Sequence, residues 1–475
     1  MAILAIDQGT SGTKAILLEG ATVISRGVAE IDVSHLPNGH VECDPHLLWK
    51  SIVDSVGQAL ACREAKSVVI SAVSLANQGE SVLVWDRKTL EPKSPILVWQ
   101  DSRSADLCAE RSKFSSEIRE ISGLENDPYF VAPKIRWLKD KYPSGFEITT
   151  LDTWIIAKLT NNFVTDISTA SRSMLFNLNT GKWDAKLIEI WELDDQKMPE
   201  VLNNDAVVGE INSPDLPNLK GVPLAGLIVD QAAALLAENC LELGEAKCTY
   251  GTGAFLLCNI GNIAKVSGNR LATSFAWQVS DGKRYYEDGQ VFTVGSAVDW
   301  LINNKLLDSV HEIDKLSIET NGVFAIPGFA GYGAPRWKPN GTASITGLSL
   351  GSTRNEVARA VLNGIAAQVT ELIEVIAKDG SQIRQMRVDG GLTQSKTLMQ
   401  FQADLAQVEI ELFPHPDATA VGVGVLGTIA IDKSASLKSA LPQVKSAISY
   451  EPNWSKDRAE EFMNEWRTRT SRGNE

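Results

Sequence analysis

The sequence predicts an α/β protein with two similar domains and a ligand cleft between them. Three observations favour this fold class. Two apolar runs, residues 3–6 and 15–18, flank a tight-turn segment and predict a β-hairpin at the start of the chain. A second hairpin of similar composition is predicted at residues 247–259. Elsewhere, apolar runs of strand length alternate with helical patterns, as in proteins that alternate strands and helices.

The tip of the first hairpin carries groups that suit a polyphosphate. Gly9 and Gly12 allow positive φ and a close backbone approach. Asp7 ends the first strand with a carboxylate that can hold Mg²⁺ through water. The remaining polar residues of the tip add hydroxyl donors and one positive charge: Thr10, Ser11, Thr13 and Lys14. The alternative is an ordinary glycine-rich hairpin, and the second copy argues against it.

The second hairpin repeats this chemistry with Gly251, Thr252 and Gly253. One such hairpin near the start of each half predicts that the phosphate tail of a nucleotide lies between them. The arrangement resembles the two-domain, actin-like ATPase architecture of actin, Hsp70 and the sugar kinases. We place the domain boundary at residue 239, which predicts domains of residues 1–239 and 240–475.

Composition excludes several classes of function. A length of 475 residues allows two domains with separate cores. The net charge of −14, without a basic cluster, argues against nucleic-acid binding. Asp7 interrupts the first apolar run, so we expect no signal peptide, and we expect no integral membrane segment. Six cysteines without CxxC spacing predict reduced thiols in a cytoplasmic protein.

In the first half, polar residues follow the predicted buried strands. A third antiparallel strand is expected at residues 22–29, and Asp44 is expected to cap a helix that begins at Pro45. The mostly apolar run 68–75 predicts a buried strand, and Glu80 follows it. Because residues beyond the carboxyl end of such a strand face the ligand crevice, Glu80 is a site candidate. The alternative is a solvated loop carboxylate.

The next apolar run ends in Trp99 and is followed by Asp101 and Arg103. An aromatic ring beside a carboxylate and a guanidinium suits a polyhydroxyl ligand. The alternative is a strand end at which Asp101 or Ser102 caps a helix. Tyr129, in the loop before an amphipathic helix, can also reach the cleft.

Asp230 is the strongest catalytic candidate. It follows the apolar run 224–229 and precedes the small-residue helix 232–239. A carboxylate at such a junction points into the cleft and can accept a proton from a substrate hydroxyl, while Gln231 can bind a neighbouring hydroxyl. The alternative is that Asp230 only caps the helix.

The second half continues the alternation beyond its hairpin. Gly295 begins a helix whose amino end suits phosphate oxygens. After a long amphipathic helix at 354–378, the strand 383–388 ends in two glycines against which an adenine ring can lie. The further elements that we predict are helices at 395–407, 419–430 and 456–472 and a strand at 408–412.

A series of short motifs resembles, in the same order, those of the FGGY carbohydrate kinases, and most closely those of the glycerol kinases. The resemblance runs from residue 1 to about 430. The motifs are DQGTS at 7–11, VWQ at 98–100, DPYF at 127–130, DTW at 152–154, VTD at 164–166, ASRSMLFN at 170–177, DQAAAL at 230–235, YGTG at 250–253, GAP at 333–335 and VDGG at 388–391.

The resemblance implies roles for individual residues. Asp230 would be the general base and Asp7 would hold magnesium. The polyol pocket would be formed by Gly79, Glu80, Trp99, Arg103, Tyr129, Asp230, Gln231 and Phe255. The nucleotide would be bound by Thr10, Ser11, Gly12, Lys14, Thr252, Gly253, Gly295, Gly390, Gly391 and Ser395.

The departures from the glycerol-kinase pattern affect mainly the acceptor. Glycerol kinases have an arginine that binds glycerol where this chain has Gly79, so another donor, for which we consider Arg103, would have to replace it. Ser395 stands where those kinases often have an adenine-facing asparagine.

We therefore expect a phosphotransferase with an alcohol acceptor, which uses ATP and Mg²⁺ to phosphorylate glycerol or a similar small polyol. A xylulokinase-like kinase of a ketopentose or a longer polyol is the alternative, and a non-catalytic nucleotide-binding regulator is a third possibility. The sequence leaves open the acceptor, any allosteric control and the oligomeric state, for which a homodimer and a homotetramer are both considered.

Overall fold

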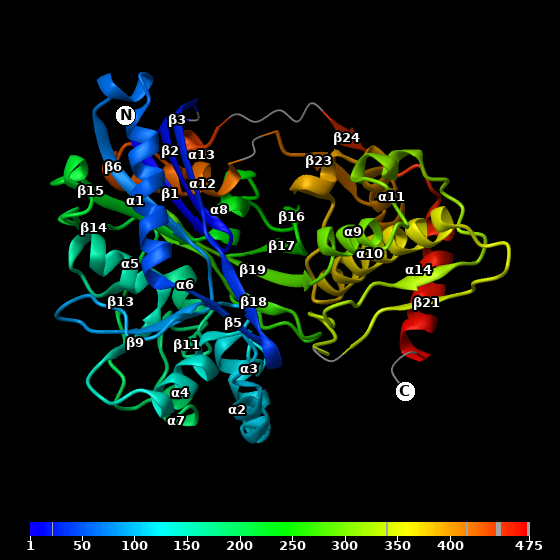
Figure 1. Cartoon of the computed structure of the whole chain (residues 1–475), viewed down its shortest axis with the longest axis horizontal. Helices are drawn as coiled ribbons and strands as arrows, with labels where there is room; N and C mark the ends of the chain where they lie inside the picture. The colour runs from blue at the N-terminus through cyan, green and yellow to red at the C-terminus, as the bar shows by residue number, and fades with distance from the viewer. Residues whose placement is uncertain (21, 339–340, 415–416, 443–447, 473–475) are drawn as a thin grey trace.

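The computed structural model describes residues 1–20, 22–338, 341–414, 417–442 and 448–472. Two large mixed β-sheets form the two halves of the molecule, with helices packed around each (Figure 1).

The first sheet has the strand order β14-β15-β6-β1-β2-β3. Strands β1, β2 and β3 are consecutive and antiparallel, whereas β6 and β15 run parallel to β1. The expected strand after the hairpin is present as β3. The strands are β1 (Ala2–Gly9), β2 (Gly12–Glu19), β3 (Thr22–Glu30), β6 (Ile70–Asn77), β14 (Val207–Glu210) and β15 (Pro223–Val229).

The second sheet repeats this plan with the order β18-β19-β17-β16-β22-β23-β24. Its hairpin strands β16 and β17 are antiparallel, and β22 and β23 run parallel to β16. Two sheets built alike, each with a hairpin beside two parallel strands, agree with the predicted pair of similar domains. The strands are β16 (Ala246–Tyr250), β17 (Ala254–Gly261), β18 (Ala272–Val279), β19 (Gly282–Val291), β22 (Gln385–Asp389), β23 (Glu409–Leu412) and β24 (Ser449–Tyr450).

A third sheet, of order β4-β5-β8-β7-β9, was not expected from the sequence, because its strands are only two to four residues long. The strands are β4 (Val33–Leu36), β5 (His40–Cys43), β7 (Val82–Trp85), β8 (Ile96–Leu97) and β9 (Glu147–Thr150). Three two-stranded pairs complete the β-structure: β10 (Val164–Asp166) with β13 (Glu200–Leu202), β11 (Phe176–Asn177) with β12 (Lys182–Trp183), and β20 (Phe324–Ile326) with β21 (Ser344–Thr346).

The helices agree closely with the sequence patterns. Asp44 caps α1, as predicted, by accepting a hydrogen bond from the His46 amide at 2.8 Å. The helices of the first half are α1 (Pro45–Ala61), α2 (Ala105–Glu110), α3 (Ser115–Ser122), α4 (Val131–Lys141), α5 (Leu151–Thr160), α6 (Ile167–Ser171), α7 (Ala185–Ile190) and α8 (Asp230–Ala237). Those of the second half are α9 (Gly295–Asn303), α10 (Arg354–Lys378), α11 (Lys396–Ala406), α12 (Ala418–Ile431), α13 (Leu437–Ala440) and α14 (Lys456–Arg472).

Helix α12 joins the two halves. It belongs to the second half of the sequence, yet it packs on β1, β6 and β15 of the first sheet and against α8 (Figure 1). Its glycines permit this close contact, because a Cβ at Gly422 would lie 2.0 Å from the Ala233 carbonyl oxygen and one at Gly427 would lie 2.1 Å from Ser74 Oγ. A helix from beyond residue 239 thus packs into the first half, so the two halves are not packed independently. The domain boundary at residue 239 stays a prediction.

Helix α10 is the one helix among the described residues that is long and apolar enough to cross a membrane. However, 83% of its most apolar 18-residue window is buried inside the structure. This burial is that of a core helix, and its apolar side chains belong to the main cluster of the second half.

Candidate active site

The first hairpin closes with a two-residue turn. Gly9 pairs with Gly12, so that Thr10 and the exposed Ser11 form the tip. A Cβ atom at Gly12 would lie 2.7 Å from the carbonyl oxygen of Ala29, so glycine is required at this position.

Thr10 connects this tip to the predicted polyol pocket. Its Oγ1 accepts a hydrogen bond from Trp99 Nε1 at 2.9 Å and donates one to Gln78 Oε1 at 3.3 Å. The predicted phosphate-binding and acceptor-binding residues therefore meet directly at this hydroxyl.

Asp7 and Lys14 lie opposite each other on β1 and β2. Burial raises the pKa of Asp7 to about 6, and the positive charge of Lys14 opposes that shift. Lys14 Nζ also lies 3.9 Å from Asp417 Oδ1, and Arg26 pairs with the other oxygen of that carboxylate at 2.6 Å. Lys14 is thus placed at the hairpin between two carboxylates.

Asp7 has the chemistry that Mg²⁺ requires beside a nucleotide. The described residues contain no group of three His, Cys, Asp or Glu side chains that could hold a metal by themselves. Mg²⁺ commonly binds one or two carboxylates together with water and substrate phosphates, so a single aspartate at a phosphate hairpin is sufficient. The charge of Asp7 also raises the pKa of Asp230, and a cation beside Asp7 would relieve this repulsion.

The second hairpin is bonded to the amino end of α9. The amides of Gly295 and Ser296 donate to the carbonyl oxygens of Gly251 and Thr252 at 3.0 and 3.2 Å. A Cβ at Gly295 would lie 2.6 Å from the Gly251 oxygen, and one at Gly253 would lie 2.6 Å from the Val291 oxygen. The structure therefore brings Thr252, Gly253 and Gly295 together, although the Gly295 amide is already used by the hairpin.

Asp230 is the first residue of α8 and not its N-cap, which is Val229. Its Oδ1 accepts a hydrogen bond from the Gln231 amide at 2.7 Å. Burial, followed by the charges of Asp7 and Glu80, raises the pKa of Asp230 to about 7. The carboxylate is therefore poised to gain or lose a proton near neutral pH.

The side chain of Gln231 has a fixed orientation. Lys247 is buried in β16, and its Nζ donates to Gln231 Oε1 at 2.6 Å and to Thr249 Oγ1 at 2.8 Å. Because an ammonium only donates, the amide oxygen faces Lys247 and the amide NH₂ is left for other partners.

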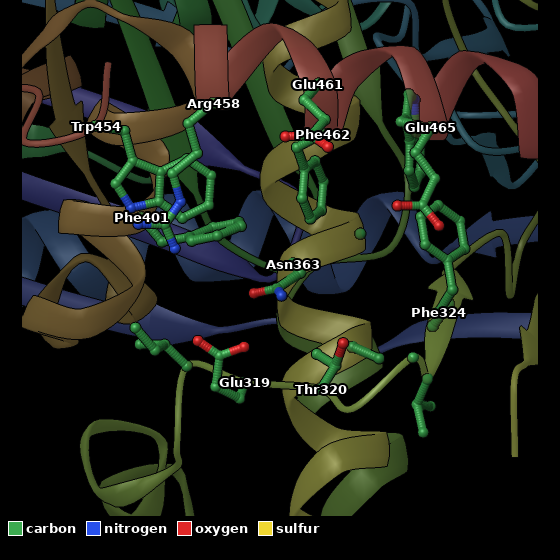
Figure 2. Close-up of a pocket in the computed structure, with 17 residues that line it drawn as sticks. Glu319, Thr320, Phe324, Asn363, Phe401, Trp454, Arg458, Glu461, Phe462 and Glu465 are labelled. Atoms are coloured by element: carbon green, nitrogen blue, oxygen red, sulfur yellow. The ribbon is translucent and has the colours of Figure 1, made fainter. Parts of the chain in front are cut away.

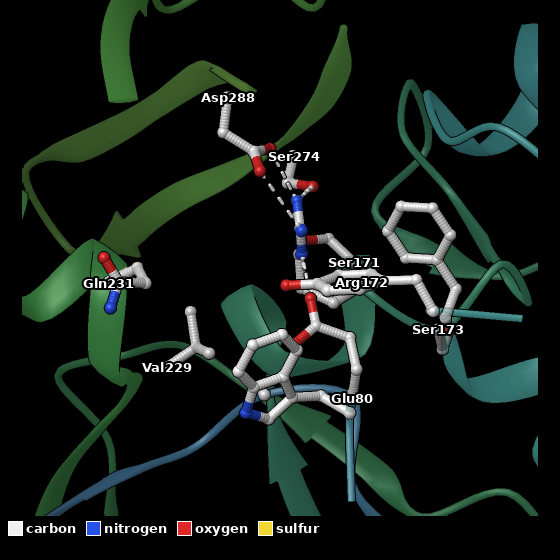
Figure 3. Close-up of polar contacts among 12 residues, drawn as sticks. Glu80, Ser171, Arg172, Ser173, Val229, Gln231, Ser274 and Asp288 are labelled. Carbon is white, nitrogen blue, oxygen red and sulfur yellow. Dashed lines mark hydrogen bonds and ion pairs between the residues drawn. The ribbon is translucent and has the colours of Figure 1, made fainter. Parts of the chain in front are cut away.

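Glu80 belongs to a buried ion-pair network that crosses between the halves (Figure 3). Its Oε1 accepts a hydrogen bond from Arg172 Nε at 2.5 Å. The same guanidinium donates to Asp288 Oδ1 at 2.7 Å and to Ser274 Oγ at 3.1 Å, both in the second half. Burial raises the pKa of Glu80, and the charge of Arg172 opposes this.

Three aromatic rings line the same region. The ring centroid of Trp99 lies 5.7 Å from that of Tyr129 and 5.9 Å from that of Phe255, both edge to face. Tyr129 and Trp99 come from the first half and Phe255 from the second, so predicted pocket residues of both halves do lie together.

The structure does not bring Arg103 to Glu80. The Arg103 guanidinium donates to Asp101 at 2.7 Å and pairs with Glu42 at 2.8 Å, and it lies over the Trp137 ring at 5.0 Å. The guanidinium that bonds Glu80 is that of Arg172. This arginine lies in the motif at 170–177, but the sequence did not predict a role for it.

Gly79 lies against Val229. A Cβ atom at Gly79 would be 3.0 Å from Val229 Cγ2. Figure 3 shows the valine side chain pointing toward the space between Gln231 and Glu80. An apolar methyl group, which the sequence did not suggest as part of the site, therefore lies next to Gly79.

The two glycines after β22 differ in their surroundings. Gly390 has a φ of +99°, and a Cβ there would lie 2.4 Å from the Tyr250 carbonyl oxygen, whereas a Cβ at Gly391 would meet nothing within 4 Å. Gly391 thus offers the open surface expected for a flat ring. Ser395 caps α11, and its hydroxyl donates to Asp314 Oδ1 at 2.7 Å, so it is used within the protein.

A cavity of about 310 Å³ lies away from these residues, between α10, β20 and α14 (Figure 2). Its wall includes Asn363, Phe401, Trp454, Arg458 and Phe462. None of the predicted site residues lines it.

Comparisons with known proteins agree with this geometry. A model described as the N-terminal domain of the FGGY family of carbohydrate kinases matches residues 2–237, and the C-terminal domain model of that family matches residues 246–431. A glycerol kinase of Koribacter versatilis is 36% identical over 99% of this chain and 98% of its own, and one of Alkalilimnicola ehrlichii is 37% identical over 98% and 97%.

Solved structures show the same fold. The crystal structure of Plasmodium falciparum glycerol kinase with ADP superimposes with a TM-score of 0.92 at 31% identity, covering 99% of this chain and 98% of that one. A xylulose kinase from Rhodospirillum rubrum has a TM-score of 0.86 at 21% identity, covering 100% of both chains. The predicted two-domain, actin-like fold class is confirmed.

Proposed function

The chain belongs to the FGGY family of carbohydrate kinases, and from this premise we propose that it transfers the γ-phosphate of ATP to a hydroxyl of glycerol or a similar small polyol. Asp230 carries the proposal. It lies at the start of α8 with a pKa of about 7, beside Gln231, whose amide NH₂ is free to bind a hydroxyl. Such a carboxylate suits a general base that takes the proton of the attacking hydroxyl.

The two hairpins would bind the phosphates of ATP. Phosphoryl transfer requires mainly positioning and charge neutralisation, which backbone amides and hydroxyls of glycine-rich tips supply. Mg²⁺ would be held at Asp7 and would neutralise phosphate charge. The remaining proposed nucleotide contacts are Thr10, Ser11, Gly12, Lys14, Thr252, Gly253, Gly295, Gly390, Gly391 and Ser395.

The acceptor would lie against the aromatic rings of Trp99, Tyr129 and Phe255. The carboxylate of Glu80, held by Arg172, would accept hydrogen bonds from acceptor hydroxyls. The second candidate, a ketopentose or longer polyol as acceptor, is suggested by Gly79, which lacks the arginine of glycerol kinases and lies against the methyl group of Val229.

We also propose that the enzyme works in the reducing cytoplasm. All six cysteines are free thiols, and five of them are buried. Disulfides are rare in that compartment, where thiols stay reduced.

The test is ATP-to-ADP turnover with Mg²⁺ against glycerol, erythritol, threitol, ribitol, xylitol, arabitol, dihydroxyacetone, xylulose and ribulose. We expect acceptor-dependent turnover that Asp230→Asn lowers by a factor of about 10² to 10⁴. Turnover fastest on glycerol would assign a glycerol kinase, and turnover confined to longer acceptors would assign the second candidate. Nucleotide binding without turnover on any acceptor would overturn the proposed function and favour a non-catalytic regulator.

A further inference from the structure

A buried lysine lies behind the proposed acceptor pocket. Lys134, in the first turns of α4, is 0% exposed. Its Nζ lies within hydrogen-bond distance of four backbone carbonyl oxygens, those of Glu80 at 3.2 Å, Trp99 at 3.3 Å, Tyr129 at 2.5 Å and Phe130 at 3.4 Å.

These carbonyls come from three segments that are distant in the sequence. Glu80 lies between β6 and β7, Trp99 follows β8, and Tyr129 and Phe130 precede α4. The side chains of Glu80, Trp99 and Tyr129 form much of the proposed acceptor pocket. One ammonium group thus bonds the backbone of the three segments on which that pocket depends.

The charge of Lys134 is unexpected at its place in the fold. The neighbouring α4 residues Val131, Ile135 and Leu138 pack into an apolar cluster. A buried ammonium is costly unless its donors are satisfied, and an apolar side chain would suit a purely structural position equally well. The carbonyl acceptors satisfy the ammonium, which indicates that the polar contact itself is needed.

The backbone conformation of Glu80 also indicates that the contact with Lys134 is needed. Its φ is +53°, in the left-handed region that non-glycine residues adopt only when surrounding contacts hold them there. Lys134 binds the carbonyl oxygen of this residue. The side chain of Glu80 is directed at Arg172 from this conformation.

We propose that Lys134 is a positioning residue for the acceptor, whose ammonium holds the Glu80, Trp99 and Tyr129 segments at the spacing that acceptor binding requires. This inference rests on the proposed function. It assigns Lys134 a larger effect on the acceptor than on ATP, because its Nζ bonds the backbone of the acceptor segments directly and is connected to the first hairpin only through Trp99, whose Nε1 donates to Thr10.

The protonation state of Lys134 gives a second way to test the proposal. Burial lowers the pKa of Lys134 to about 8, against the opposing charges of Glu80, Asp101 and Asp127 and the Cys108 thiol. Loss of the proton above this pH removes one donor and the positive charge that attracts the carbonyls. The hold on the three segments therefore weakens as pH rises through about 8.

The experiment compares KM for the best acceptor of the panel with KM for ATP in three variants. Lys134→Met should raise the acceptor KM about tenfold, the loss expected for one charge-assisted hydrogen bond, and raise the ATP KM by a smaller factor. Lys134→Arg keeps the charge and should recover part of the loss. Lys139→Met, a partly buried residue of the same helix that bonds Asp195 and the Glu192 carbonyl and not the pocket segments, is the matched control and should change neither constant.

An unchanged acceptor KM in folded Lys134→Met, or an equal rise of both constants, would overturn the proposal. If that variant does not fold, the wild-type enzyme provides the test. Its acceptor KM should rise between about pH 8 and 9.5 by a larger factor than its ATP KM, and a flat acceptor KM would overturn the inference. Asp230, with a pKa of about 7, is largely ionised in this range. Absence of wild-type turnover would instead overturn the proposed function, and this inference with it.

Discussion

Val229 Cγ2 lies 3.0 Å from the position that a Cβ atom at Gly79 would occupy. Val229 ends β15, and Gly79 follows β6, its parallel neighbour in the first sheet. The contact therefore joins the carboxyl ends of two adjacent strands, which is where ligands bind in open α/β sheets. A side chain at position 79 would therefore press on the valine methyl, which would have to shift to admit it.

Gly79→Arg alone should lower activity on every acceptor, because its Cβ would press on Val229. Gly79→Arg combined with Val229→Ala should raise kcat/KM for glycerol about tenfold or more, the gain expected from one charged hydrogen bond. Steady-state kinetics on glycerol and xylulose measure both effects. Val229→Ala alone is the control for a merely enlarged pocket, and an equal gain in that variant would show that the arginine contributes nothing.

The pH dependence of turnover should report Asp230. Because its pKa is about 7, kcat should rise with pH, reach half of its maximum near pH 7 and level off above about pH 8 as the base form accumulates. Asp230→Asn should reduce kcat by a factor of about 10² to 10⁴ and remove this dependence. A wild-type profile that is flat from pH 5.5 to about 8 would be incompatible with a base of this pKa.

The same carboxylate should cost stability at neutral pH. The pKa of Asp230 is raised from 3.8 to about 7 in the folded protein, so the folded state binds more protons than the unfolded state between these values. The contribution of Asp230 to the free energy of unfolding therefore falls as pH rises from 3.8 to about 7. Asp230→Asn should raise Tm at pH 8 and raise it less at pH 4, as measured by calorimetry; a lower Tm at pH 8 would contradict the assignment.

Lys247→Met should affect Gln231 and Asp230 separately. The amide of Gln231 loses its fixed orientation, so the acceptor KM should rise about tenfold. The charge of Lys247 lowers the pKa of Asp230, so the midpoint of the kcat profile should move to higher pH. In a Gln231→Ala background the effect on KM should disappear and the pH shift should remain; persistence of the KM effect there would disprove the coupling.

Gly390→Ala and Gly391→Ala form a matched pair on the proposed adenine surface. The first places a Cβ 2.4 Å from the Tyr250 oxygen at a φ of +99°, and should destabilise the fold by about 1–3 kcal/mol in denaturant unfolding. The second meets open space, so its stability should stay within about 0.5 kcal/mol. The methyl group added by Gly391→Ala should raise the ATP KM, and an unchanged ATP KM would argue against adenine at this surface.

Much of the fold could be read from local patterns. The long helix α10 has the bounds that its periodicity predicted, and Asp44 and Pro45 begin α1 as expected. Both hairpins were found because glycines and hydroxyl residues stand between apolar strands. Such features depend on neighbouring residues, and short-range propensity is strongest for long periodic segments and tight turns.

The third sheet was not predicted, since strands as short as β8 leave no periodicity to detect. The position of α12 was also not predicted. Its glycine-rich sequence indicated a helix, and only the assembled molecule shows that those glycines lie against Ala233 and Ser74 of the first half.

The residue types and their order already indicate the chemistry available to this protein: two glycine-rich hairpins, a carboxylate at a strand end and an FGGY motif series. Which of these groups lie together depends on the folded chain. The fold directed Arg103 to Asp101 and Arg172 to Glu80, and it placed Lys134 beside carbonyls up to 54 residues away in the chain. The physical reason is that hydrogen bonds and ion pairs depend on distance in space, which a local pattern of residue types does not specify.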